Sequence, residues 1–136
     1  MESYTRRPLE LTPVDITDYT VTAVAGRLSG GAGSGGTDSV SLQQCLLQFG
    51  AASAELRLIV GDFVEWLGNG RPPWAAYQAL VSGRLIALDK QPGIRPVEVG
   101  ETWRRLVAKC LLKVAGPEAK TACGTTQLAG GLEARI

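Results

Sequence analysis

Two positively charged residues stand close together in a stretch that reads as a β-hairpin. Residues 85–99 contain two short apolar or alternating runs, and Pro92 and Gly93 lie between them, where a type II turn needs a fixed and then a positive φ. Because side chains alternate along a strand, Lys90 and Arg95 should extend the apolar, core-facing side of the hairpin past the core. Two such cations suit an anionic ligand, such as a triphosphate or a nucleic-acid backbone. The alternative is that both are solvated turn residues.

More cations follow on a helix that we expect to begin near Glu101. Its apolar residues recur with a helical period, which makes one face core, and its other side is basic. From residue 84 to residue 113 there are seven basic and three acidic residues, whereas the whole chain has a net charge of +1. This local excess favours a polyanionic partner, although a solvated helix face looks similar. The basic residues of this helix are Arg104, Arg105, Lys109 and Lys113.

Four short motifs surround these cations: IALDK at 86–90, GIRPV at 93–97, WRRLVAK at 103–109 and TQLAGG at 126–131. Together they resemble the fingers region of reverse transcriptases, most closely those encoded by retrotransposons without long terminal repeats. The resemblance covers the chain from about residue 62 to its end. It implies that Lys90 and Arg95 contact the phosphates of an incoming nucleotide, with a basic helix packed behind the hairpin. Glu98 departs from the pattern, but alternation places it on the face opposite Arg95.

The carboxylates that reverse transcriptases use for catalysis have no counterpart in this sequence. In that family, converging acids that include a Tyr-x-Asp-Asp hairpin hold two metal ions. This chain has five Asp residues and no Asp-Asp pair. The resemblance therefore predicts a fragment that stops where the palm domain would begin, with no catalytic or metal-binding residues, and which does not polymerise alone. Its expected partner is nucleic acid, either an RNA template or an RNA–DNA hybrid.

Several residue types that carry chemistry are absent or poorly spaced. The chain has no histidine, which is the commonest general base and metal ligand. Cys45, Cys110 and Cys123 show no C-x-x-C spacing, so neither a zinc site nor a disulfide framework is indicated. We expect reduced thiols, no cofactor and an intracellular protein of the cytoplasm or nucleus. No apolar run reaches the roughly eighteen residues of a membrane span, so no membrane partner is expected.

The first 36 residues are expected to form a polar N-terminal segment, loosely held like an arm, and a glycine-rich linker, with a short strand at 19–24. The linker, GRLSGGAGSGG, has too many glycines to become ordered without a ligand or neighbour. Gly30 and Gly35 have the spacing of a phosphate-binding loop, but Gly36 stands where that loop has its lysine. An enzyme that uses this loop is the weakest hypothesis.

Residues 37–136 are expected to form one fingers-like domain. The predicted fold class is α+β, mostly helical with one β-hairpin at 85–99 and no palm domain. Ser41 and Gln44 form a capping-box pair at the start of the first helix, and Gly116–Pro117 should end the basic helix. The predicted helices are 41–49, 52–67, 74–81, 101–115, 118–123 and a weak one at 126–136.

Two functional readings remain open. The first is a truncated reverse transcriptase-like protein whose fingers region contacts nucleic-acid or nucleotide phosphates. The second is a non-catalytic α+β interaction module or relic, which forms a homo-oligomer or binds a protein through an exposed apolar surface. Salt separates the two, because binding to a polyanion weakens steeply with added salt and an apolar interface does not.

Overall fold

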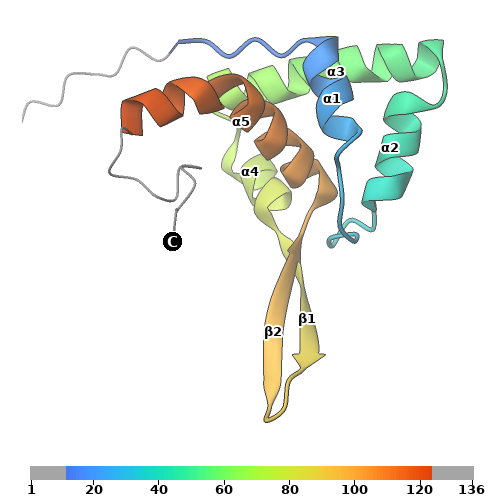
Figure 1. The fold of residues 1–136 in the computed structure, drawn as a ribbon, viewed down its shortest axis with the longest axis vertical. Helices are drawn as coiled ribbons and strands as arrows, with labels where there is room; N and C mark the ends of the chain where they lie inside the picture. The colour runs from blue at the N-terminus through green and yellow to red at the C-terminus, as the bar shows by residue number, and fades with distance from the viewer. Residues whose placement is uncertain (1–11, 124–136) are drawn as a thin grey trace, which may run out of the picture.

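The computed structural model describes residues 12–123, which form five helices and one two-stranded antiparallel sheet (Figure 1). The predicted fold class, mostly helical α+β with one β-hairpin, is confirmed. The predicted helix at 126–136 and the motif at 126–131 lie outside the described residues. In chain order the elements are α1 (Asp18–Ala25), α2 (Ser39–Leu47), α3 (Ala51–Asn69), α4 (Trp74–Val81), β1 (Gly83–Asp89), β2 (Ile94–Gly100) and α5 (Thr102–Cys123).

The hydrophobic core lies where α1, α2, α3 and α5 meet. Each of these helices contributes one large side chain that is entirely buried: Val21, Leu46, Val64 and Leu106. Burying a side chain of this size contributes about 1.5–3 kcal/mol. Cys110 lies beside them on α5, and its burial raises the pKa of the thiol to about 11. The thiol is therefore protonated at neutral pH.

Residues 19–24 belong to α1, so the predicted strand is wrong. Thr17 caps the helix by accepting a hydrogen bond from the amide of Thr20 at 3.3 Å. Val21 and Val24 then fall on one face and enter the core. The β-branched residues favoured a strand locally, but burial against other helices overrides that preference. Residues 12–36 thus contribute to the same core as the rest of the described chain.

Helices α2 and α5 have bounds that differ from the predicted ones. Helix α2 begins at Ser39 because Asp38, not Ser41, is its cap: the Ser41 amide donates to Asp38 Oδ1 at 2.7 Å. That hydrogen bond is the main reason that the pKa of Asp38 is lowered. Helix α5 continues through Pro117 and is visibly bent (Figure 1). A proline lacks the amide donor and crowds the carbonyl four residues earlier, which bends a helix without always ending it.

Strands β1 and β2 form a hairpin, residues 83–100, that projects from the helices and is called the arm below (Figure 1). Seven residues per strand give it a length of about 23 Å. The amide of Lys90 donates to the carbonyl of Gly93 at 2.9 Å, and Gly93 has the predicted positive φ, +104°. The turn therefore runs from Lys90 to Gly93, one residue earlier than predicted, and its Gln91–Pro92 peptide is cis.

The arm does not lay its apolar face on the core, contrary to the expectation from the sequence. No arm residue belongs to the core cluster, and the side chains of Leu85 and Ile94 are 73% and 71% exposed. Ile86 and Val97 are paired across the strands and only half-buried, so the apolar residues of the arm cover one another. The arm is therefore open to solvent on both faces along most of its length.

Candidate nucleic-acid interface

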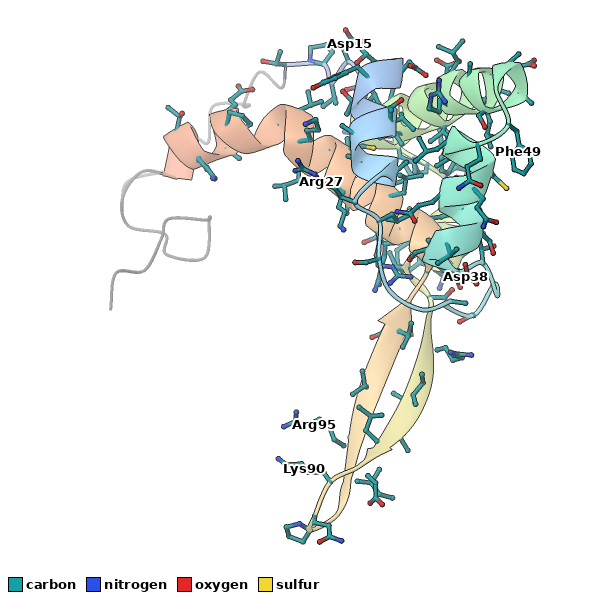
Figure 2. The ribbon with its side chains drawn as sticks, turned by 45° about the vertical axis from the view of Figure 1, so that its right-hand side comes forward. Asp15, Arg27, Asp38, Phe49, Lys90 and Arg95 are labelled. Carbon is teal, nitrogen blue, oxygen red and sulfur yellow. The ribbon has the colours of Figure 1, made fainter. Side chains whose placement is uncertain are left out.

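The tip of the arm presents two cations on one side. Lys90 immediately follows β1, and Arg95 lies opposite Leu88 in β2. Both side chains are exposed and project from the same side of the arm (Figure 2). Among residues 12–123, neither side chain forms a salt bridge or a hydrogen bond. Both positive charges are therefore available to an external anion.

Glu98, the departure noted in the sequence, lies away from this tip. It pairs with Leu85 across the strands, so its side chain is on the face opposite Arg95. Its carboxylate lies 3.9 Å from Arg104 Nη1, near the base of the arm. The negative charge of Glu98 thus lies near Arg104 at the base of the arm. It does not neutralise Lys90 or Arg95 at the tip.

The cations of α5 are placed differently. We call Arg104, Arg105, Lys109 and Lys113 the ridge, and residues 26–37 the glycine loop. Arg105 donates to the carbonyls of Ser29, at 3.0 Å, and Gly31. Lys109 donates to the carbonyl of Arg27 at 3.2 Å. Two of the ridge cations therefore hold the glycine loop against α5.

The other two ridge residues also have internal contacts. Arg104 donates to the carbonyl of Val81, at the end of α4, at 3.0 Å. The ammonium group of Lys113 lies 5.8 Å from the centre of the Tyr19 ring, within the range of a cation–π contact. Of the six predicted phosphate contacts, only Lys90 and Arg95 are thus without a partner inside the described chain.

The glycine loop is docked on the first turn of α5 and is not a free linker. The amide of Gly35 donates to Glu101 Oε1 at 2.6 Å, and Thr102 Oγ1 donates to the carbonyl of Thr37 at 2.6 Å. A Cβ on Gly33 would lie 2.8 Å from the Cα of Glu101, closer than real contacts allow. Glycine is needed there because the two backbones touch. The partners are more than 60 residues away, so no local signal in the sequence showed this docking.

This docking argues against a phosphate-binding role for the loop. The amide of Gly35 would have to face a phosphate, but it already faces the carboxylate of Glu101. Glu101 is only 8% exposed, so its negative charge is fixed beside the loop. A phosphate at this position would be repelled.

A second surface feature is an apolar groove of about 870 Å³ between α3, α4 and the start of α5. Ile59 and Phe63, both on α3, are 58% and 38% exposed and line this groove. Helix α4 has no buried residue. Its side that carries Ala76, Ala79 and Leu80 lines the groove. The main apolar lining residues are Leu56, Ile59, Val60, Phe63, Ala76, Ala79, Leu80 and Trp103.

No protein-family model, curated protein or solved structure matches the chain. Within residues 12–123, no helix has the length and apolar character needed to cross a membrane. In the same range, no three His, Cys, Asp or Glu side chains gather as a metal-binding group. What the surface can bind is therefore inferred from its own charges and shape.

Proposed function

We propose that the arm binds phosphate groups of nucleic acid, in the manner expected of a reverse transcriptase-like fingers region. The observation that carries this proposal is the pair of exposed, unpartnered cations on one side of the arm, Lys90 and Arg95. The ligand is an RNA template or an RNA–DNA hybrid, and the activity is binding without polymerisation. Such a ligand implies a location in the cytoplasm or nucleus.

Both the shape and the charge of the arm support this proposal. A two-stranded ribbon that stands clear of the helices can reach a nucleic-acid backbone without a clash with the protein body (Figure 1). An unpaired cation loses no internal contact when it moves to a phosphate, whereas Arg105 would first have to leave two carbonyls. Each phosphate contact also releases a counterion, which favours binding at low salt.

The test is binding of labelled single-stranded RNA and of an RNA–DNA hybrid across salt concentrations from about 50 to 200 mM. The Lys90→Ala, Arg95→Ala double variant should bind more weakly. Its plot of log affinity against log salt for single-stranded RNA should also be shallower by about 1.4, the loss of two phosphate contacts. The control is Arg71→Ala with Lys120→Ala, which removes the same charge from exposed positions outside the arm.

The slope distinguishes a specific contribution of the arm from general attraction. If the control pair reduces the slope as much as the arm pair, the positive charge of the whole protein is responsible and the arm has no special role. Absence of binding by the unmodified chain at low salt would also contradict the proposal. A change confined to the arm pair would support it.

A second candidate function is self-association through the apolar groove. The observation that favours it is the exposure of Ile59 and Phe63 on a hollowed, nearly uncharged surface. Light scattering over a range of protein concentrations should then show a dimer that persists in high salt. Ile59→Glu should dissociate that dimer, whereas Val40→Glu, at an exposed position on α2, should not. A monomer at all concentrations would exclude this candidate.

A further inference from the structure

A small pocket of about 310 Å³ lies between α1 and the middle of α5. Three of its lining residues are cations: Arg27, Lys109 and Lys113. The other lining residues that the structure describes, Ala23, Val24 and Leu112, are apolar, so no carboxylate from residues 12–123 lines the pocket. The described lining thus combines three positive charges with apolar side chains, none of which can accept a hydrogen bond from the cations in place of a ligand.

The fold holds these three cations in place. Lys109 and Lys113 are four residues apart on α5, so they lie on the same side of the helix one turn apart. Lys109 donates to the carbonyl of Arg27 at 3.2 Å, which fixes the backbone of Arg27 against α5. The contact of Lys113 with the ring of Tyr19 keeps its charge over α1. The cations come from two segments and converge without any help from a ligand.

Three like charges around so small a volume repel one another, and the contacts within the described residues offset this only in part. The carbonyls at the end of α1 carry a partial negative charge, but Lys109 uses only the carbonyl of Arg27. Tyr19 is the other titratable group in contact with these cations. A bound anion would remove the repulsion. The pocket therefore gains most from a ligand with concentrated negative charge and several acceptor oxygens.

We infer that this pocket binds a phosphate group. A phosphate monoester offers three acceptor oxygens and a backbone phosphodiester offers two, which suits the ammonium and guanidinium donors that α5 and the segment after α1 bring to this pocket. This inference rests on the pocket itself and is independent of the proposed role of the arm. The phosphate belongs either to a small phosphate ester or to a nucleic-acid backbone. Arg27 is exposed, so the pocket is open to a nucleic-acid backbone as well as to a small compound.

The experiment is a titration of the ¹⁵N-labelled full chain with inorganic phosphate, followed by two-dimensional NMR at constant ionic strength. The amides of Ala23, Val24 and Leu112 should shift and saturate. The Arg27→Gln, Lys113→Gln double variant should weaken binding about tenfold or more, because two charge-assisted hydrogen bonds are lost. Both side chains are exposed, and Gln at position 27 keeps the carbonyl that Lys109 uses.

Two further variants keep the inference open to refutation. Leu112→Glu adds a carboxylate at a side chain that is 68% exposed, so the fold should survive while phosphate binding is lost. The Lys90→Ala, Arg95→Ala variant should retain the phosphate-induced shifts, which separates this pocket from the arm. Shifts that never saturate, or equal affinity in the Arg27→Gln, Lys113→Gln variant, would overturn the inference.

A second titration identifies the source of the phosphate. A short single-stranded RNA without a terminal phosphate is added, and inorganic phosphate is then used to displace it. RNA that shifts the same three amides and is displaced by phosphate identifies the backbone as a ligand. Saturable shifts with phosphate but none with RNA assign the pocket to small phosphate compounds.

Discussion

Lys90 and Arg95 stand at the tip of the arm, whereas Arg105 and Lys109 lie on α5 beneath the glycine loop. All four are basic residues within one positively charged stretch of the sequence. The arm cations have no partner in the described chain, and the α5 cations donate to backbone carbonyls of the loop. The same residue types thus have two different tasks, because one region faces solvent and the other faces a segment rich in unpaired carbonyl groups.

This contrast shows why local positive charge is a weak guide to an anion site. A docked loop with many glycines presents carbonyl oxygens at close range, and Arg or Lys side chains satisfy them. A cation that donates to carbonyls in this way has fewer donors left for a ligand. Both the stability of the fold and the binding of RNA should reflect this difference between the arm and the ridge.

The largest effect should come from Arg105→Ala. This change leaves the carbonyls of Ser29 and Gly31 without a partner and should lower the free energy of unfolding by about 3 kcal/mol. Arg95→Ala, on the exposed arm, should change it by less than about 0.5 kcal/mol. Urea unfolding of both variants measures the difference. Equal losses would mean that the arm and the ridge do not differ in the way described.

A smaller loss of stability should follow from Gly33→Ala. Its Cβ would meet the backbone of Glu101 at 2.8 Å, so the loop must shift, at a cost of about 2 kcal/mol. Gly31→Ala is the matched control, since a Cβ there meets nothing within 4 Å. Urea unfolding should therefore separate two substitutions of the same kind made two residues apart. Similar behaviour of the two variants would show that the loop is not docked.

The third prediction concerns ligand binding. Lys90→Ala should make the dependence of log RNA affinity on log salt shallower by about 0.7, the value for one lost contact with a single strand. Arg104→Ala, on the ridge and outside the phosphate pocket, should change this slope much less, because its guanidinium donates to the carbonyl of Val81. Fluorescence anisotropy at several salt concentrations compares them. A larger decrease of the slope for Arg104→Ala than for Lys90→Ala would contradict this prediction.

The smallest expected effect is on the stability of the protein at acid pH, and it involves Asp38. The pKa of Asp38 lies below its ordinary value of 3.8 because the folded carboxylate accepts the Ser41 amide. Its contribution to stability is therefore complete above pH 3.8 and is lost as the pH falls further. Asp38→Asn keeps a capping oxygen and should flatten this part of the stability curve. Thermal unfolding between pH 3 and 6 measures this change in the pH dependence of stability. Asp89→Asn on the arm is the control and should leave the pH dependence unchanged.

Much of the fold could be predicted because local patterns determine it. The bounds of α4 agree with the prediction at both ends, and α3 differs by one residue at its start and two at its end. The period of apolar residues correctly assigned Leu106 and Cys110 to the core. Pro92 and Gly93 located the turn of the arm to within one residue. In these places the local preference and the tertiary packing agree.

The predictions failed where distant partners decide the structure. The glycine loop was predicted to need a ligand or neighbour to become ordered, but nothing in the sequence showed that Glu101 and Arg105, far along the chain, supply the hydrogen bonds. For the same reason the sequence could not show that Lys109 is bound by the loop. Alternation along the strands did identify Lys90 and Arg95 as neighbours on one side, because that relation depends on local geometry alone. Their role as phosphate contacts stays a prediction.

The pairing of Gly83 with Gly100 at the base of the arm gives the hairpin a modular character. Paired residues in antiparallel strands have Cα atoms only about 4.5–5.5 Å apart, so the chain leaves and re-enters the helical body at nearly the same point. The arm also contributes nothing to the core cluster. Residues 84–99 could therefore be replaced by a short turn, or by a hairpin grafted from another protein, while the helical body keeps its fold.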